Sequence, residues 1–491
     1  MYKPLIFSAN LLLTSLVVLA ALGCSGNNGT GSAGVDAGDV STDSEADSEA
    51  DSEADSETAD TSTDQADLFS ELKAVIHDKF GSIVVVSWEQ HKPARGRVEF
   101  SFDDGVWLAS PEKNRQSGHA EELLLGIPYA IEVRLRLVLD EGDETHTSDT
   151  QSIMTDALPQ LKFPGWKILS VDEDSYDSDL KYFLYSLVME MGGGSIVGIL
   201  DRQARIVWLR RTPNFRATMQ AQPSYDGTSL LIDHNSYWSI MLDQGKSSKV
   251  VRMKIDGTML ARYNTPGLHH PFTESPDGSI LWGAADGDNE TVEKLSSVGE
   301  QTTVFSCDQV SGNLEGEDYC SSNTIRWNEP TGTFLYSLYS HETILEIDPQ
   351  SGQAIRVFGH QDQAYAFDPV DMGFWWQHGG HYTEAGTLLT SSYIADENEE
   401  LVVREYEVDH DAQILRLIWS FGDGEGIRSE TMGEAHRLPN GNTLHNYGST
   451  PRMREITPDG DVVWDVATKA AAGNWEVGRT TPLKDLYSFA P

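Results

Sequence analysis

The sequence predicts an all-β protein, in which a β-propeller of about six blades follows a small β-sandwich. Short segments with alternating apolar and polar residues indicate strands that bury one face. In the second part of the chain such segments repeat every 50 to 58 residues, which suits a four-stranded propeller blade better than a solenoid turn. Helix-period patterning is almost absent, and 491 residues exceed one ordinary domain core, so at least two folded units are expected.

The first 23 residues are typical of an export signal. Lys3 precedes an apolar stretch that ends in Ala-Leu-Gly directly before Cys24. These residues resemble the lipobox of bacterial lipoproteins, which implies removal of residues 1–23, lipidation of Cys24 and an exported, lipid-anchored protein. Ser25 in place of Asp favours the outer membrane, on its periplasmic face or at the cell surface. A conventional cleavage site near Cys24 is the alternative.

Residues 24–67 predict an acidic, disordered tether. Between Asp36 and Asp67 the segment holds 13 acidic residues and no Lys or Arg, so it repels itself and cannot bury a core. The whole chain has 77 acidic residues against 35 Lys and Arg, which argues against nucleic acids and anionic surfaces as partners. We therefore expect contact with a membrane only through the N-terminal lipid.

Residues 78–156 predict the β-sandwich. Across residues 131–137 apolar residues alternate with charged ones, so one face of this strand is buried. Leu125, Pro128 and Tyr129, just before that strand, resemble the fibronectin type III pattern. No concentration of chemically reactive residues occurs in this unit, so we expect a support module.

Residues 160–485 predict the propeller. Turn motifs such as PDG and PNGN precede an apolar strand in the copies, which begin near Met219, His269, Ser321, His378 and His436. An incomplete early copy at 167–210 could be completed by residues 480–489, TTPLKDLYSF, which would close the ring. Six blades is the best count with this closure, and five or seven blades are the alternatives.

Two cysteines remain if Cys24 is acylated. Cys307 and Cys320 form a single pair in a chain expected to reach an oxidising compartment, which favours a disulfide between them. A reduced pair is the alternative. A zinc site through these two thiols would need further ligands.

The motifs of residues 160–485 resemble the bacterial arylsulfotransferase family. The most specific match is GEAHRLPNGNTLHNYGSTPRMREITPDGDVVWDV at 433–466, which follows the family's last-blade pattern. HHPFTESPDGSIL at 269–281, SSNTIRWNEPTGTFLYSLYSHETILEID at 321–348 and QHGGHYTEAGTLL at 377–389 match earlier blades. The resemblance implies a six-bladed propeller that transfers a sulfuryl group from an aryl sulfate to a phenol. It implies a small aromatic ligand, no cofactor, and no nucleotide donor such as PAPS.

The resemblance also implies roles for individual residues. His378, in the Gln-His motif, matches the family's nucleophile and would hold the group as a sulfohistidine. His269 or His270 matches the histidine of the His-His motif, and His269 or His436 would exchange a proton with the aryl oxygen. Asn323 stands where the family has an asparagine, which would hydrogen-bond a sulfonyl oxygen.

Two positions depart from the family pattern. Ser321 stands in place of a histidine, and Tyr339 in place of an arginine, so two cationic groups for the sulfate oxygens are missing. Such losses could leave a pocket that binds without turnover, unless His381 replaces one charge. We expect His270, His381 and Tyr339 at substrate-binding positions, together with Asn323.

Blade starts surround one mouth of a propeller's central channel, so these histidines are expected to converge there. A noncatalytic ligand-binding or scaffold propeller lipoprotein is the alternative function. A zinc, copper or nickel site with His378 and His381 as neighbouring ligands is a further alternative. No metal is expected, because no carboxylate or thiol recurs at the blade starts. The sequence does not predict an oligomeric state.

Overall fold

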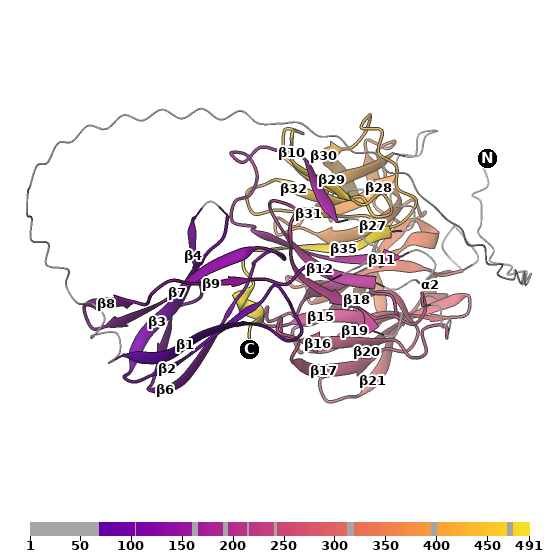
Figure 1. Ribbon diagram of the computed structural model, residues 1–491. Helices are drawn as coiled ribbons and strands as arrows, with labels where there is room; N and C mark the ends of the chain where they lie inside the picture. Colours follow the sequence, from indigo (N-terminus) through magenta and orange to yellow (C-terminus); the bar gives the residue numbers. More distant parts are fainter. Residues whose placement is uncertain are drawn as a thin grey trace, which may run out of the picture. The chain divides into compact units, whose positions relative to one another are not determined.

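The computed structural model describes residues 68–103, 105–159, 165–189, 195–213, 216–239, 243–311, 319–393, 400–468 and 475–491 (Figure 1). Cys24 and the segments predicted as leader and tether lie outside the described residues. Within these ranges nearly all regular elements are strands, which confirms the predicted all-β class. Among the described residues we find no helix with both the length and the apolar character that a membrane crossing requires.

Residues 69–154 form two sheets around one hydrophobic core. The first sheet has the order β1 (Phe69–Ile76), β2 (Val84–Gln90), β6 (Gly118–Leu124). The second is built on the antiparallel pair β3 (Ala94–Ser101) and β7 (Glu132–Glu141), joined by β4 (Trp107–Ala109), β5 (Lys113–Arg115), β8 (Glu144–Thr147) and β9 (Gln151–Met154).

Alternating burial explains why these strands stack. Val84, Val86 and Trp88 of β2 are buried in the same core as alternate residues of β7. The unit begins before the predicted boundary at residue 78, because β1 pairs along β2. β1 alternates only between half-buried and exposed side chains, so its sequence pattern is weak.

In the described part of residues 165–491, six further sheets of four or five strands follow. The first three sheets have the orders β13-β12-β11-β35, β14-β15-β16-β17 and β18-β19-β20-β21. Their strands are β11 (Tyr182–Met189), β12 (Ser195–Asp201), β13 (Ile206–Arg211), β14 (Ala221–Pro223), β15 (Leu230–His234), β16 (Lys249–Met253), β17 (Met259–Asn264), β18 (Leu268–Glu274), β19 (Ile280–Asp286), β20 (Asn289–Leu295), β21 (Gln301–Ser306) and β35 (Trp475–Leu483).

The other three sheets have the orders β22-β23-β24-β25, β26-β30-β29-β28-β27 and β10-β34-β33-β32-β31. Their strands are β10 (Trp166–Val171), β22 (Ser322–Asn328), β23 (Thr333–Leu338), β24 (Thr343–Asp348), β25 (Gln353–Gly359), β26 (Ala366–Asp368), β27 (Trp375–Tyr382), β28 (Leu388–Tyr393), β29 (Leu401–Asp409), β30 (Ile414–Phe421), β31 (Glu434–Arg437), β32 (Thr443–Asn446), β33 (Arg452–Ile456) and β34 (Val462–Thr468).

One end strand of each sheet takes part in a closed circle of contacts. β18 packs against β22, β22 against β27, β27 against β31, and β14 against β35. Two hydrogen-bonded links complete the circle. Gln220, directly before β14, donates to the carbonyl of Phe272 in β18, and Thr480 N in β35 donates to the carboxylate of Glu434 in β31.

The C-terminal strand completes the first of these sheets. β35 pairs with β11, with Leu483 opposite Tyr182 and Trp475 opposite Met189, which is the completion that the sequence predicted for its early copy. The beginning of that copy differs from the prediction. Residues 166–171 form β10, which pairs with β34 at the far edge of the last sheet.

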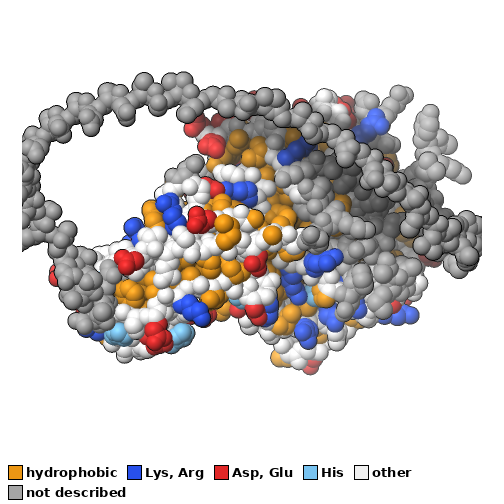
Figure 2. Space-filling model, in the orientation of Figure 1, with side chains coloured by type: hydrophobic (Ala, Val, Ile, Leu, Met, Phe, Trp, Pro, Cys, Tyr) orange, Lys and Arg blue, Asp and Glu red, His pale blue; other side chains and the backbone are white. Residues whose placement is uncertain are grey.

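The sandwich and the first propeller-like sheets share a core. Phe80 of the sandwich stacks on Trp208 of β13 with ring centroids 5.2 Å apart, and Ser82 donates to the carbonyl of Val207 at 2.7 Å. Phe489, from a short C-terminal 3-10 helix, packs into the same cluster. On the face shown in Figure 2, hydrophobic side chains lie among charged ones.

Cys307 and Cys320 are joined in a disulfide, the pairing expected from the sequence, with Cα atoms 6.2 Å apart. Cys307 follows β21 directly, and Cys320 precedes β22, so the bond links two neighbouring sheets.

Candidate functional site

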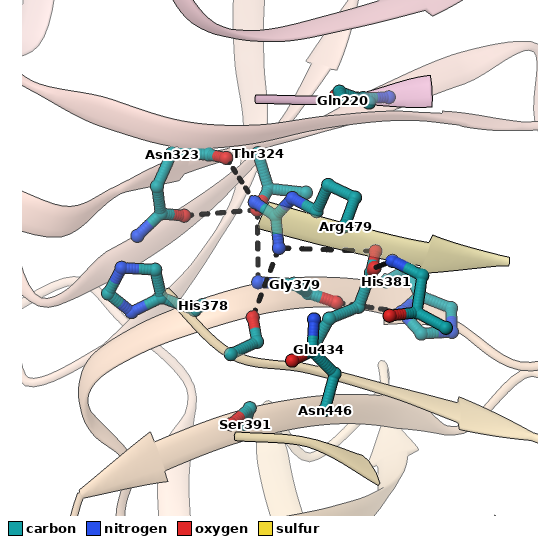
Figure 3. A network of polar contacts seen from close by, with 12 residues as sticks. Gln220, Asn323, Thr324, His378, Gly379, His381, Ser391, Glu434, Asn446 and Arg479 are labelled. Carbon is teal, nitrogen blue, oxygen red and sulfur yellow. Dashed lines mark hydrogen bonds and ion pairs between the residues drawn. The ribbon is translucent and has the colours of Figure 1, made fainter. Parts of the chain in front are cut away.

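The end strands of the circle carry most of the predicted site residues. These are His269 and His270 on β18, Asn323 on β22, His378 and His381 on β27, and His436 on β31. Tyr339 lies in the 3-10 helix Tyr339–His341, directly after β23. Figure 3 shows several of these side chains around the arginine of β35.

His378 is a buried, neutral imidazole with a defined tautomer. Its Nδ1 lies 3.0 Å from the carbonyl oxygen of Trp376, which can only accept, so Nδ1 carries the proton and Nε2 carries the lone pair. Burial, followed by the charge of Arg479, lowers the pKa of His378 to about 3. At neutral pH its Nε2 therefore has the lone pair that a nucleophile needs.

His270 and Tyr339 lie near His378. Burial lowers the pKa of His270 well below its usual range, and His269, His378 and Arg479 lower it further, so all three are close enough to act on it. The rings of His269 and His270 are 4.7 Å apart between centroids, and the ring of Tyr339 is 5.3 Å from that of His378. One region therefore holds His378 and both members of the His-His motif.

His381 and His436 form a second group. Their ring centroids are 5.8 Å apart, and Nε2 of His436 lies 3.3 Å from a carboxylate oxygen of Glu434. Burial lowers the pKa of His381 to about 4, with His436 and Arg326 as the next causes. The structure thus places His436 beside His381 and Glu434, and the convergence of all these histidines at one mouth stays a prediction. No cluster of three His, Cys, Asp or Glu among the described residues is arranged to hold a metal ion.

The backbone of β27 is irregular around His378. Pairing with β28 shifts register on both sides of His378, between it and Trp375 and between it and His381. Gly379 has a φ of +69°, and a Cβ there would lie 3.1 Å from the Cα of Glu434. His378 pairs with Ser391 and His381 with Leu389, so three residues of β27 span two residues of β28, and glycine at position 379 meets the left-handed φ of this bulge without strain.

Asn323 is buried and held by the protein. Its Nδ2 donates to the carbonyl oxygen of Gln377 at 2.6 Å, and its Oδ1 accepts from the hydroxyl of Thr324 at 3.0 Å. The expected donation to a sulfonyl oxygen would therefore have to use the remaining N–H of the amide.

Arg479, a buried arginine of β35, was not among the predicted site residues. Its guanidinium donates to the carbonyl of Gly433 at 3.1 Å, to the carbonyl of Asn323, and to the hydroxyl of Thr324 at 2.9 Å. The carboxylate of Glu434 is 3.9 Å away. Burial lowers the pKa of Arg479, but an arginine still remains charged at neutral pH. Figure 3 shows Arg479 beside Thr324 and near Glu434 and Gly379, and its charge lowers the pKa of His378 and of His270.

Part of the chain matches a known protein family. Residues 269–469 match the family model described as Arylsulfotransferase (ASST). This region belongs to the arylsulfotransferase family. It spans β19 to β34 and the predicted site residues from His269 to His436, and it ends before Arg479. The arginine thus lies outside the part of the chain that the arylsulfotransferase pattern covers.

Some solved structures are also similar, and no curated protein matches the chain. A protein of unknown function from Bacteroides caccae is 16% identical, covering 62% of this chain and 99% of that one, with a TM-score of 0.41. A putative 6-phosphogluconolactonase from Bacteroides uniformis is 13% identical, covering 79% and 99%, with a TM-score of 0.39. A quinonprotein alcohol dehydrogenase-like protein from Bacteroides thetaiotaomicron is 8% identical, covering 83% and 95%, with a TM-score of 0.35.

Proposed function

We propose that this chain is an aryl sulfate sulfotransferase that moves a sulfuryl group between phenolic compounds through His378. The observation that supports the proposal is the state of His378 itself. It is buried and neutral, its Nδ1 is fixed on the carbonyl of Trp376, and its Nε2 lone pair lies in the electrostatic range of Arg479. The match to the arylsulfotransferase family alone does not favour covalent transfer, because this mechanism needs a neutral histidine with a lone pair on Nε2.

The proposed reaction has two displacements. Nε2 of His378 attacks sulfur, an N–S bond forms, and the S–O bond to the aryl group breaks, so that the phenoxide leaves with the electron pair and takes up a proton. The carbonyl of Trp376 stabilises the charge on the sulfated ring through Nδ1–H. A phenol then loses its proton, attacks sulfur and restores His378. His269 is the proton-exchanging group in this proposal, since His436 belongs to the second group.

We also propose a six-bladed propeller, a fibronectin type III-like unit before it, and a location at the outer membrane. The circle of end strands and the closing pair of β35 with β11 support a six-bladed propeller, and the two sheets of residues 69–154 support a fibronectin type III-like unit. The lipobox-like sequence before Cys24 supports an exported lipoprotein of the outer membrane, whose partners are small aromatic ligands.

A noncatalytic binding propeller is the second candidate. Two hydrogen bonds of Arg479 go to backbone carbonyls and one goes to Thr324, and Asn323 already donates to Gln377. Donors that are held by protein oxygens are less available to a transferring sulfuryl group, which favours this candidate.

A transfer assay separates the two candidates. Purified protein is incubated with a chromogenic aryl sulfate and a phenol acceptor, and phenol release is followed with and without acceptor. We expect acceptor-dependent release that falls by on the order of 1,000-fold or more in His378→Ala, because the nucleophile is lost.

His445→Gln is the matched control. His445 is also buried, and burial likewise lowers its pKa to about 3, but its Nε2 lies 3.0 Å from the hydroxyl of Ser391 in β28. This variant should keep its transfer rate per folded molecule. Absence of release at high concentrations of wild-type protein, with an aryl sulfate still bound, would favour the binding propeller.

A further inference from the structure

The carboxylate of Glu290 is fully buried beside the candidate site. Glu290 lies on β20, the third strand of its sheet, with 0% exposure. One oxygen accepts from the hydroxyls of Ser322 and of Tyr336, the latter at 2.7 Å. The other accepts from the backbone N–H of Ser322 at 2.9 Å and lies 3.1 Å from Nε2 of His269. A carboxylate with this many neighbours is held in one orientation.

A glycine makes room for this carboxylate. A Cβ on Gly283, in the neighbouring strand β19, would lie 2.5 Å from Oε1 of Glu290 and 2.9 Å from the hydroxyl oxygen of Ser322. Any larger residue at position 283 would therefore displace the carboxylate from His269. The space for Glu290 is built into two adjacent strands.

The neighbours of Glu290 fix its charge and the tautomer of His269. Burial acts to raise the pKa of Glu290, but His269 and the donors of Ser322 outweigh it, so the net pKa is lowered and the group is a carboxylate. A carboxylate only accepts, so Nε2 of His269 carries a proton. Nδ1 of His269 then has the lone pair, and it is buried with no hydrogen-bond partner among the described residues.

The imidazole of His269 packs between aromatic rings and the carboxylate of Glu290. The ring of Tyr237 is 5.5 Å away, the ring of His270 is 4.7 Å away, and Tyr336 binds the far oxygen of Glu290. The backbone carbonyl of His269 accepts from Asn235 at 2.8 Å and from Trp238 at 2.6 Å. The main chain is therefore fixed independently of the imidazole.

We infer that Glu290 is a positioning residue that holds His269 with Nδ1 available for proton exchange with the phenolic oxygen of donor and acceptor. The inference rests on the proposed sulfuryl transfer and deepens it. It names the group that moves the proton and the carboxylate that orients this group.

The proton balance follows from the two displacements. In the resting protein Nδ1 of His269 has the lone pair, so the proton that His269 gives to a leaving phenoxide is the one that Nδ1 took from the acceptor phenol of the preceding turnover. The neutral ring then keeps its Nε2–H on Glu290. When an acceptor phenol attacks the sulfated His378, Nδ1 of His269 takes the phenolic proton. Glu290 stays ionised throughout and stabilises the imidazolium form.

Leaving-group dependence tests the inference. Transfer from a nitrophenyl sulfate and from a sulfate of a weakly acidic alkylphenol is measured for wild type and Glu290→Gln. A poor leaving group needs the proton more, so we expect a loss of about 100-fold or more with the alkylphenyl sulfate and of less than about tenfold with the nitrophenyl sulfate. Equal losses with both substrates would overturn the inference.

Two further variants separate this role from folding. Tyr336→Phe removes one hydrogen bond from Glu290. Its transfer rate should also fall more with the alkylphenyl sulfate than with the nitrophenyl sulfate, but by a smaller factor than in Glu290→Gln. Glu346→Gln is the matched control, since Glu346 is equally buried but binds Thr333 at 2.7 Å and Arg356 at 2.7 Å in another sheet. Any decrease in the transfer rate of Glu346→Gln should be the same for both aryl sulfates. The same dependence in Glu346→Gln would contradict the assignment to Glu290.

A spectroscopic measurement tests the same contact without turnover. Nitrogen NMR of protein labelled at histidine, assigned with His269→Gln, should show His269 protonated at Nε2 and unprotonated at Nδ1. The opposite tautomer would overturn the inference. If wild-type protein transfers no sulfuryl group, the proposed function fails, while this measurement still decides whether Glu290 orients His269.

Discussion

The charge that acts on His378 comes from a residue without a counterpart in the repeat motifs. Arg479 lowers the pKa of His378 and of His270, and its guanidinium binds backbone oxygens of β22 and of the segment before β31. Ser321 and Tyr339 stand where the family pattern has two cationic residues. Arg479 provides a positive charge from a different strand, β35, and this strand carries none of the histidine motifs.

Replacing Arg479 tests whether that charge serves transfer. We expect Arg479→Gln to lower the rate of sulfuryl transfer by about 100- to 1,000-fold, because one positioned cation near the developing charge is lost. Rates are compared per folded molecule, with circular dichroism as the measure of folding. Arg404→Gln is the control, since Arg404 is also buried and donates to a backbone carbonyl, that of Gly373, from the third strand of its sheet. An Arg479 variant within tenfold of wild type would show that the charge is only structural.

At the scale of elements, β27 carries His378 and His381 on an irregular backbone. Its pairing with β28 shifts register on both sides of His378, and Gly379 has a left-handed φ of +69°. The backbone N–H of Gly379 donates to Thr324 at 3.0 Å, and its carbonyl oxygen lies 2.8 Å from Nδ1 of His381. The motif Gln-His-Gly-Gly-His therefore encodes a bulge as well as two imidazoles.

Alanine substitutions at two glycines of the same hairpin distinguish the cost of a left-handed φ from the cost of a steric clash. Gly379 has a φ of +69° and Gly386 a φ of +80°, but a Cβ on Gly379 would lie 3.1 Å from atoms of Glu434, whereas a Cβ on Gly386 would face open space. We expect Gly386→Ala to lower the free energy of unfolding by about 1–2 kcal/mol from φ alone. Gly379→Ala should cost about 1–3 kcal/mol more, because the crowded strand must shift. Urea unfolding measures both, and equal losses would contradict the crowding.

At the scale of the whole molecule, the last strand closes the circle that the first sheet opens. β35 pairs with β11 along its length, and Val477, Leu483 and Leu486 are buried in the cores on either side. The same strand carries Arg479, so closure of the fold and completion of the site depend on one segment.

Removing residues 475–491 tests this dependence. Five buried apolar side chains, Trp475, Val477, Leu483, Leu486 and Phe489, would be lost. At about 2 kcal/mol each, their burial is comparable to the whole stability of a typical domain, roughly 5–15 kcal/mol. We expect the truncated chain to show no cooperative thermal transition by calorimetry, and a peptide of residues 475–491 added in trans to restore it. A truncated chain with an unchanged melting temperature would contradict this role.

The sequence determined the features that depend on neighbours along the chain. Strand alternation and the repeat of 50 to 58 residues predicted an all-β protein, the placement of the histidines at end strands, and the return of the C-terminal stretch to the first sheet. The pairing of Cys307 with Cys320 followed from there being two candidates once Cys24 was set aside. Each of these is a local pattern or a count.

Tertiary structure alone decided which side chains meet. Arg479 reaches the carbonyl of Asn323 across 156 positions, and Glu290 reaches Ser322 across 32 positions from a third strand. Such contacts depend on how sheets pack and where a strand bulges, and no periodicity along the chain records them. The sequence thus determined the circle of strands and the residues on it, while packing around the circle decided that His378 contacts Tyr339 within the range of the charge of Arg479, and that His436 contacts His381.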